Sequence, residues 1–597
     1  MFYRTICLLL LISFSAMAQQ TNSPTQIAFL ADVHLQDIYG SFSDTDYKGI
    51  VNPKIGKYTI ARTMGSQLHS TRIFNENYFA FIAALEDIVA RNIKLVALPG
   101  DYSDDGQPIH IKGLKRILQH YEQQYNIQFF ITTGNHDPVG PFQKESGKSD
   151  FLGEGGKAQP IYSKEGLHSV NPETEHPTII TKDIAKMGYD GILKELGSFG
   201  FYPRKEHLYW ATPFSTYTYE DYSYDKAHKE AQLPHRTYEV EPNFIVPDVS
   251  YVVEPIPGIW LLAIDGDVYL PIDKNKSATN PNNYHGASTG YNNVLTNKQH
   301  LISWAKRVAD EAKKQGKTLI TFSHFPMVDF NDDASSTLRA LLGPKKWQLE
   351  RVPDETVAEA FAEAGITIHV AGHMHINDTG VRTTKNGNTL VNIQSPSLAA
   401  YIPGYKILTL HDNTTVEVET ITLNEVPRFN ELFPIYETEH QFLTTLNILG
   451  IWDKEVLNAN TYHDFMLWHL KELVRLRFLN DWPAPVKEFL LTANLETIAN
   501  KTNVTLSDGA IAYSGTDLLY DFYKLRNADV LALKDIPEKR LKYYRQLIKA
   551  YKTITPADTL TAQLQQVFFC MNQFLNGAPS QHFMVNLKTG EVKAIVP

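Results

Sequence analysis

Residues of the kinds that bind divalent metals follow five short apolar runs of the chain. Such runs are typical of buried β-strands. Ligands of an open α/β sheet bind beyond the carboxyl ends of its strands. If the runs are parallel neighbours, we therefore expect their terminal residues to meet at one sheet edge. The runs and the residues that follow them are IAFLA with Asp32 and His34, LVALPG with Asp101, FFITTG with Asn135, His136 and Asp137, LITFS with His324, and TIHVAG with His373 and His375.

Apart from His136 and Asp137, these residues are two carboxylates, an amide and four imidazoles, which are too many polar groups to leave unpaired at one edge. Divalent cations would satisfy them, which predicts a metal-dependent hydrolase. Asp32 and His34 lie two residues apart, so both project the same way from an extended strand end and suit one metal. Asp101 has two carboxylate oxygens and is able to bridge two ions. Mixed oxygen and nitrogen ligands suit zinc, manganese, iron or cobalt better than calcium.

Two further residues are candidates for proton transfer. His136 adjoins Asn135, so its side chain is expected to point away from the metal that Asn135 faces. It is then free to donate a proton to a leaving alkoxide. Asp137 either orients the imidazole of His136 or caps a turn.

Length and composition favour a folded protein of more than one domain. The chain has 597 residues, of which 43% are hydrophobic and 20% are charged. Its formal net charge of −10 gives no basic footprint and argues against a nucleic-acid-binding surface. This charge does not exclude a small anionic substrate, because bound metals dominate the local field.

The N-terminal residues 1–18 have the pattern of a secretory signal peptide. Arg4 precedes an apolar stretch, and Ala16-Met17-Ala18 is an A-x-A cleavage site. The alternative is a membrane anchor, for which the apolar stretch is short, and no later segment is apolar enough to cross a membrane. Cleavage would leave Cys570 as the one cysteine, without an internal disulfide. These features predict an exported bacterial protein, either periplasmic or secreted.

Residues 25–424 alternate strand-like and helix-like segments, which predicts an α/β layered domain. Helices are expected at 75–90, at 296–314 with Thr296 opening a capping box, and at 354–364. A long insertion covers about residues 138–241. Its aromatic stretch at 207–224 either lines a substrate cleft or packs as a small core.

Residues 425–597 are predicted to form a mostly helical C-terminal domain that ends in a hairpin with its turn at Thr589-Gly590. The domain either flanks the fold or shapes the site. Two arginines, Arg72 and Arg204, are placed either to grip phosphate oxygens or to serve as surface charges.

The segments ADVH (31–34), GDYSDD (100–105), GNHD (134–137), SHFP (323–326) and GHMH (372–375) together resemble the motif series of the calcineurin-like metallophosphoesterase superfamily. Their order matches, and the resemblance covers about residues 25–423. It implies a four-layer α/β/β/α sandwich with the site on loops at one end of two sheets. Purple acid phosphatases carry a tyrosine three residues after the bridging aspartate, where this chain has Asp104, which argues against a tyrosinate–iron site.

The resemblance implies a dinuclear centre that hydrolyses small-molecule phosphate monoesters or diesters by a metal-bridging hydroxide. His136 would be the proton donor or a phosphate contact, with Asp137 supporting it. A second hypothesis keeps the same fold and metals in a secreted, non-catalytic binding protein. The implied ligands are Asp32, His34, Asp101 and His375 for one ion, and Asp101, Asn135, His324 and His373 for the other.

Overall fold

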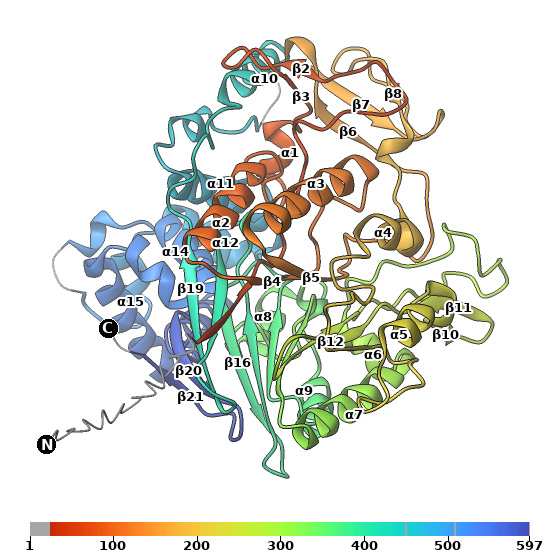
Figure 1. The fold of residues 1–597 in the computed structure, drawn as a ribbon. Coiled ribbons are helices and arrows are strands. Elements are labelled where there is room, and N and C mark those ends of the chain that lie inside the picture. The colour runs from red at the N-terminus through yellow and green to blue at the C-terminus, as the bar shows by residue number, and fades with distance from the viewer. Residues whose placement is uncertain (1–23, 448–449, 507–508, 596–597) are drawn as a thin grey trace, which may run out of the picture.

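The structure is a computed structural model that describes residues 24–447, 450–506 and 509–595. The predicted signal peptide lies outside these residues. Two seven-stranded sheets form the centre of the molecule, with helices on both outer sides (Figure 1). The predicted four-layer α/β architecture with a mostly helical C-terminal segment is confirmed.

The first sheet has the order β21-β20-β19-β18-β1-β4-β5. Strands β1, β4 and β5 run parallel to one another, and the remaining neighbours pair antiparallel. All five residues of β4 are buried, as expected for a parallel strand that is covered on both faces. The strands are β1 (Thr25–Phe29), β4 (Leu95–Pro99), β5 (Gln128–Thr132), β18 (Gly404–Leu410), β19 (Thr415–Thr422), β20 (His582–Asn586) and β21 (Val592–Ala594).

The second sheet has the order β16-β17-β15-β14-β13-β12-β9. Strands β13, β14, β15 and β17 are parallel. Three of the five motif runs thus lie in the first sheet and two in the second, so the expectation of a single sheet edge is wrong. The strands are β9 (Tyr209–Ala211), β12 (Tyr251–Ile256), β13 (Ile259–Ile264), β14 (Thr318–Ser323), β15 (Ile368–Ala371), β16 (Asp378–Thr383) and β17 (Thr389–Gln394).

The two sheets pack face to face. The rings of Phe29 on β1 and Phe322 on β14 meet edge to face, with centroids 6.0 Å apart. Thr132 Oγ1, at the end of β5, donates to the backbone oxygen of Ile264 on β13. This packing brings the carboxyl ends of the parallel strands of both sheets to one end of the sandwich.

Helices α2 (Asn77–Ala90) and α3 (Pro108–Tyr125) lie outside the first sheet, and α7 (His300–Lys314) and α9 (Glu355–Glu363) outside the second (Figure 1). The predicted helix at 354–364 is confirmed, with Asp354 at its N-cap. The predicted capping box at Thr296 is wrong. Thr296 belongs to a separate short helix, α6 (Tyr291–Asn297), and its hydroxyl donates to the backbone oxygen of Asn293.

The insertions form small elements around this frame. Most aromatic side chains of residues 207–224 pack as a core: Trp210 and Tyr217 are buried, and Tyr209 stacks on Trp260 of β13 at 4.9 Å. The elements are β2 (Ile50–Val51), β3 (Tyr58–Thr59), α1 (Met64–Leu68), β6 (Gly147–Leu152), β7 (Ala158–Tyr162), β8 (Ile179–Ile180), α4 (Gly188–Leu196), α5 (Tyr224–Glu230), β10 (Thr237–Glu241), β11 (Phe244–Pro247) and α8 (Ser335–Leu342).

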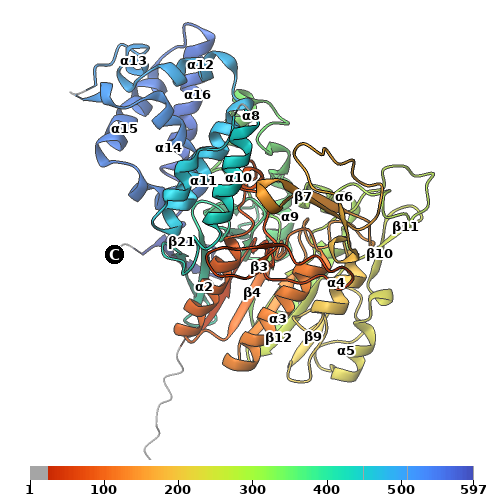
Figure 2. The ribbon, with the colours of Figure 1, turned by 90° about the horizontal axis from the view of Figure 1, so that it is seen from above.

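The C-terminal segment forms a group of helices beside the sheets (Figure 2). Its last two strands form the predicted hairpin, and β20 pairs with β19 of the first sheet. The domain boundary at 424/425 stays a prediction, and the two segments that it separates share a sheet. The helices are α10 (Phe433–Thr445), α11 (Tyr462–Leu476), α12 (Ala484–Thr492), α13 (Leu495–Asn500), α14 (Gly515–Ala528), α15 (Glu538–Thr553) and α16 (Thr559–Phe574).

Among the residues described, no helix combines the length and apolar character that crossing a bilayer requires.

Candidate metal centre

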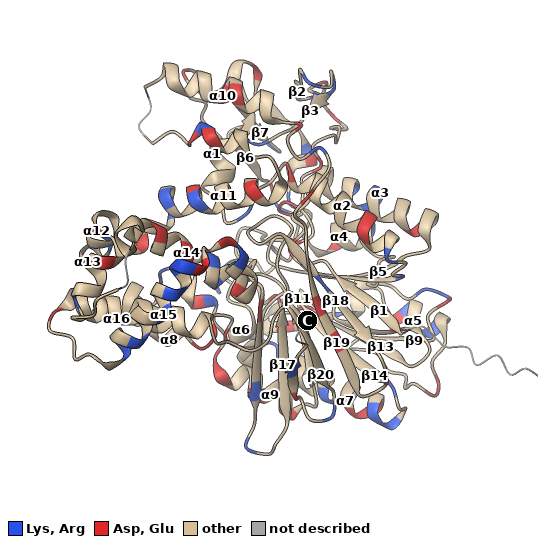
Figure 3. Ribbon diagram, turned by 90° about the vertical axis from the view of Figure 1, so that its left-hand side faces the viewer, with Lys and Arg blue, Asp and Glu red and all other residues tan. Residues whose placement is uncertain are grey.

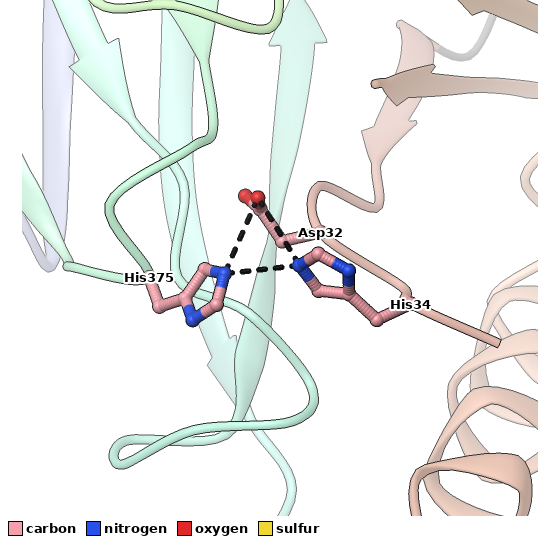
Figure 4. Close-up of side chains that lie close together, drawn as sticks. All are labelled: Asp32, His34 and His375. Carbon is pink, nitrogen blue, oxygen red and sulfur yellow. Dashed lines mark hydrogen bonds and ion pairs between the residues drawn. The ribbon is translucent and has the colours of Figure 1, made fainter. Parts of the chain in front are cut away.

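Asp32, His34 and His375 form a first group of converging polar side chains (Figure 4). The Nε2 atoms of the two imidazoles lie 3.1 Å apart. Asp32 Oδ1 lies 3.8 Å from Nε2 of His34 and 3.5 Å from Nε2 of His375. All three residues are buried. Asp32 and His34 follow β1, and His375 follows β15, so both sheets contribute to the group.

Asp101, His324 and His373 form a second group. Nε2 of His324 lies 3.1 Å from Asp101 Oδ2 and 3.0 Å from Nδ1 of His373. Asn135 Oδ1 lies 3.2 Å from the same His324 nitrogen. These side chains follow β4, β14, β15 and β5 respectively.

Asp101 joins the two groups. Its Oδ2 is 3.1 Å from His324 Nε2 in the second group and 3.8 Å from His34 Nε2 in the first. Its Oδ1 accepts the backbone N–H of His136 at 2.8 Å. The structure thus brings all seven sequence-predicted ligands together, with Asp101 at the position that the sequence analysis gave to a bridging carboxylate.

The backbone at these ligands is strained in a consistent way. Asp32, His34, Asp101, His373 and His375 all have positive φ, between 42° and 76°. For a residue with a Cβ, this left-handed region costs on the order of 1 kcal/mol or more. Strain of this kind persists where the surroundings over-determine it, and it clusters at functional sites.

Two motif glycines leave the room that the ligand side chains fill. A Cβ on Gly372 would lie 2.3 Å from Asp32 Oδ2, and one on Gly134 would lie 2.5 Å from Asp101 Oδ1. Heavy atoms do not approach so closely without a shift of the carboxylate. Glycine is therefore required at both positions for the carboxylates to keep their places.

The orientation of the imidazoles fits bound cations. His324 Nδ1, His375 Nδ1 and His373 Nε2 each donate to a backbone oxygen, at 3.1–3.2 Å. In the neutral ring, the other nitrogen is unprotonated and turns a lone pair into the centre. Lone pairs that face each other and carboxylates at 3.0–3.8 Å suit ligands that share an ion about 2.0–2.2 Å from each of them. The accepting oxygens belong to Pro99, Thr71 and Ser288.

The pKa values indicate the same preference for added positive charge. Burial is the main reason that the pKa values of His34 and His373 fall well below 6.5, which keeps both rings neutral, as metal ligation requires. Burial opposes protonation of His324 too, yet Asp101 raises its pKa to about 9. Burial would raise the pKa of Asp101, but His324 and His136 outweigh it and hold this pKa well below 3.8.

His136 lies at the rim of the centre, with a different partner from the one predicted. Its Nδ1 contacts Asp105 Oδ1 at 2.5 Å, and its ring stands edge-on to that of His34 with centroids 5.1 Å apart. Its Nε2 has no hydrogen-bond partner among the described residues. Asp137 instead accepts hydrogen bonds from the backbone N–H and the hydroxyl of Ser103. The geometry therefore does not support an orienting role for Asp137, because the tight Gly134–Asp137 turn directs it to Ser103.

Arg72 is the cation beside His136. Its Nη2 lies 3.5 Å from His136 Nδ1 and donates to Asp104 Oδ1 at 3.3 Å. Asp104 also contacts Arg62 and Lys148. The second candidate arginine, Arg204, pairs with Glu122 at 2.6 Å instead.

Sequence reasoning missed Asp105, Lys148 and Ser288. Asp105 stands in the GDYSDD motif, which was the available signal for it. Lys148 belongs to the long insertion and pairs with Asp105 at 2.7 Å. Ser288 contributes only a backbone oxygen. Neither of the latter two has a local pattern that marks it.

Comparison with known proteins agrees with this arrangement. The model of the calcineurin-like phosphoesterase family matches residues 25–377. No curated protein sequence matches the chain.

Three solved structures show low similarity. A dimetal phosphatase from Danio rerio has 10% identity and a TM-score of 0.31, over 67% of this chain and 96% of its own. Purple acid phosphatase PPD1 from yellow lupin has 9% identity and a TM-score of 0.30, over 67% and 52%. GAP50 of Plasmodium, described as the anchor in the inner membrane complex, has 11% identity and a TM-score of 0.24, over 67% and 85%.

Proposed function

Because this chain belongs to the calcineurin-like phosphoesterase family, we propose that it is a dinuclear metal-dependent hydrolase of small-molecule phosphate monoesters or diesters. The observation that carries the proposal is the position of Asp101, which contacts an imidazole of each ligand group. One carboxylate between two sets of inward lone pairs supports two ions rather than one.

The residues present fit a pair of manganese, zinc, iron or cobalt ions. When bound, such ions supply Lewis-acid polarisation of the phosphoryl group and lower the pKa of water. The chain's own contribution is to fix the ligand atoms through backbone hydrogen bonds and to bury them from solvent. We assign Asp32, His34, Asp101 and His375 to one ion, and Asp101, Asn135, His324 and His373 to the other.

His136 is assigned to proton transfer at the leaving group. Its Nε2 has no partner in the part of the chain that the structure describes, whereas Nδ1 is held by Asp105. A carboxylate at one ring nitrogen orients the imidazole and favours a proton at the other. Arg72 adds a positive charge beside the same ring, where it supports binding of a phosphate oxygen.

Export is part of the proposal and is supported by the signal-peptide pattern of residues 1–18. Expression of the full chain in a bacterial host, followed by N-terminal sequencing of the periplasmic protein, tests it. The mature chain is expected to begin at Gln19. Recovery of the full-length chain in the cytoplasm alone would contradict export.

The test of the activity uses the mature chain loaded with Mn²⁺ or Zn²⁺. Its substrates are 4-nitrophenyl phosphate as monoester and bis(4-nitrophenyl) phosphate as diester. Asp101→Asn should lower kcat/KM by about 100-fold or more, because metal binding is lost. The matched control is Asp310→Asn, at an exposed aspartate of α7, which should leave kcat/KM unchanged.

The outcome also separates the two hypotheses. Turnover of the diester assigns a phosphodiesterase, and turnover of the monoester alone assigns a phosphatase. Bound metal without turnover of either substrate contradicts the proposal and favours the non-catalytic binding protein.

A further inference from the structure

A pocket of about 520 Å³ opens beside the metal centre, where the C-terminal segment meets the second sheet. Thr71 and His375 line one side of it, so it borders the first ligand group directly. The opposite side comes from the segment after α8 and from the C-terminal segment. Its charged lining residues are Lys345, Lys346, Arg351, Arg477, Arg526, Glu350 and Asp481.

The pocket has an excess of positive charge that the rest of the chain does not share. Five basic side chains face two acidic ones, although the whole chain carries a net charge of −10. Outside the pocket, the C-terminal helices carry both acidic and basic residues (Figure 3), with a second basic run on α15. An excess of one sign in a concave site attracts ligands of the opposite sign.

Most of these cations have no acidic partner. Lys346 pairs with Asp481 at 3.1 Å. By contrast, no carboxylate oxygen of the described residues lies within 4.0 Å of Arg351, Arg477 or Arg526. Cations in a partly buried site are costly unless something neutralises them, so the pocket is suited to an anion from outside the chain.

Neutral groups hold these arginines in place without cancelling their charge. Arg526 donates to Asn331 Oδ1 at 3.0 Å and lies over the ring of Trp347 at 4.3 Å. Arg477 donates to the backbone oxygen of His69 at 3.2 Å. The Nε atom of Arg351 is buried and has no hydrogen-bond partner in the part of the chain that the structure describes. The guanidinium groups of Arg477 and Arg526 are therefore held in place, and Arg351 keeps a buried donor that an anion is able to accept.

The pocket and the metal centre belong to one electrostatic unit. His375, a residue of the first ligand group, lines the pocket together with Thr71. Thr71 accepts a hydrogen bond from His375, and the next residue, Arg72, lies beside His136. A ligand that spans the pocket and the centre would meet positive charge along its whole length.

We propose that the substrate carries a second phosphate group, which binds in this pocket while the scissile phosphate lies at the metal centre. This inference rests on the proposed function and narrows its substrate class to bisphosphorylated small molecules. Trp347 and Phe478 line the same pocket and offer apolar surface to the part of the substrate that links the two phosphates. A substrate with one phosphate would leave the pocket arginines unpaired.

The kinetic test compares α,ω-alkanediol bisphosphates with the matching monophosphates, over linkers of two to eight carbons. The mature chain is loaded with Mn²⁺ or Zn²⁺ and phosphate release is measured. We expect kcat/KM to be at least about tenfold higher for the bisphosphate of the best linker length. Equal values for mono- and bisphosphates at every length would overturn the inference.

Variants locate the effect. Arg351→Gln and Arg477→Gln should each reduce the preference for the bisphosphate about tenfold, mainly by raising KM. Their kcat/KM for the monophosphate should fall less than that for the bisphosphate, so that the ratio of the two is what changes. The matched control is Arg307→Gln, at an exposed arginine of α7 outside the pocket lining, which should preserve the preference. An unchanged preference in both pocket variants would also overturn the inference.

A binding measurement separates failure of the inference from failure of the proposed function. Calorimetric titration with alkane-α,ω-bisphosphonates, against alkyl monophosphonates, needs no turnover. Tighter binding of the bisphosphonate that is lost in Arg477→Gln supports the pocket even if no ester is hydrolysed. Hydrolysis of monophosphates without any gain from a second phosphonate supports the proposed function and contradicts the inference.

Discussion

Hydrogen bonds to the backbone orient the side chains of the metal centre. His324, His373 and His375 each donate one ring nitrogen to a backbone oxygen and direct the other into the centre. Asp32 accepts the backbone N–H of His373 at 2.8 Å through Oδ2, so a residue of the second group helps to orient a residue of the first. Changes at single ligands are therefore expected to affect both groups.

The contact between His136 and Asp105 gives a prediction at this scale. Asp105→Asn should lower kcat about 10- to 100-fold, because the imidazole loses the partner that orients it. In a His136→Ala background, the same substitution should have little further effect, since the two residues act as one unit. Steady-state kinetics of the four variants of this cycle measure the coupling.

Asp137 provides the contrast to this cycle. Its carboxylate is bound by Ser103, so Asp137→Asn should act on the fold and lower the Tm in the His136→Ala background as much as in the wild type. Additive effects of Asp105→Asn and His136→Ala on kcat would argue against the assignment of Asp105.

Gly372→Ala should weaken metal binding, although every candidate ligand residue is kept. The new Cβ would lie 2.3 Å from Asp32 Oδ2, so the carboxylate must leave its place. We expect at least a tenfold loss of metal affinity by equilibrium dialysis. The control is Gly286→Ala, where a Cβ has nothing within 4 Å. Equal metal affinity in the two variants would contradict this account of the motif glycine.

Residue types and spacing were sufficient to predict that the seven candidate ligands and His136 are neighbours. They were insufficient to predict the hydrogen-bond partner of His136. Asp137 is adjacent in sequence, whereas the actual partner, Asp105, follows a different strand. The position of Arg72 likewise depends on Asp104, which is remote in sequence. Contacts between loops that are far apart in the chain leave no periodic pattern in a single sequence.

At the scale of elements, the candidate ligands all follow the carboxyl ends of strands. The apolar runs predict strands, and the structure confirms them, but a run carries no mark of the sheet to which it belongs. The faces of α2 show a related limit. Its apolar side chains do not share one environment: Phe79 and Ile88 are buried, whereas Ile82 and Ala83 are only half-buried and line a surface cavity.

Glu439 joins two elements and makes stability depend on pH. It lies on α10 and accepts the first two backbone N–H groups of α1, from Met64 at 2.7 Å and Gly65 at 3.0 Å. Burial raises its pKa from 4.5 to about 7. The folded protein thus retains a proton that the unfolded chain has lost, and the free energy of unfolding falls as pH rises from about 4.5 to 7.

Glu439→Gln removes this titration. Between pH 5 and pH 7.5, the wild type should lose about 2 kcal/mol more of its free energy of unfolding than the variant does. Urea denaturation at the two pH values measures this difference. A wild type whose stability falls no more steeply than that of the variant would contradict the burial of a titrating carboxyl at this junction.

At the scale of the whole molecule, the C-terminal segment is an integral part of the layered fold. The hairpin β20–β21 extends the first sheet, and Asn377, two residues after the candidate ligand His375, donates its backbone N–H to Asn527 of α14 at 2.9 Å. The sequence predicted the helices and the hairpin from local patterns. The pairing of β20 with β19 could not be predicted from the sequence, because strands so far apart in the chain share no local pattern.

Two truncations test this dependence. A chain that ends at residue 424 would expose the β19 edge and the apolar surface under the helices, so we expect aggregated protein by size-exclusion chromatography. A chain that ends at residue 591 loses only β21, whose side chains are largely exposed. It should stay soluble, with a Tm within about 5 °C of the wild type. A soluble, folded 424-residue product would show that the α/β domain is independent.

The most direct test of the central claim is a metal titration of the mature chain in which bound Mn²⁺ and the rate of aryl phosphate ester hydrolysis are measured in the same samples. We expect the rate to rise to its maximum at two bound ions per chain, and Asp101→Asn to bind fewer ions and lose turnover. Two bound ions without turnover, or turnover that survives Asp101→Asn, would contradict the central claim.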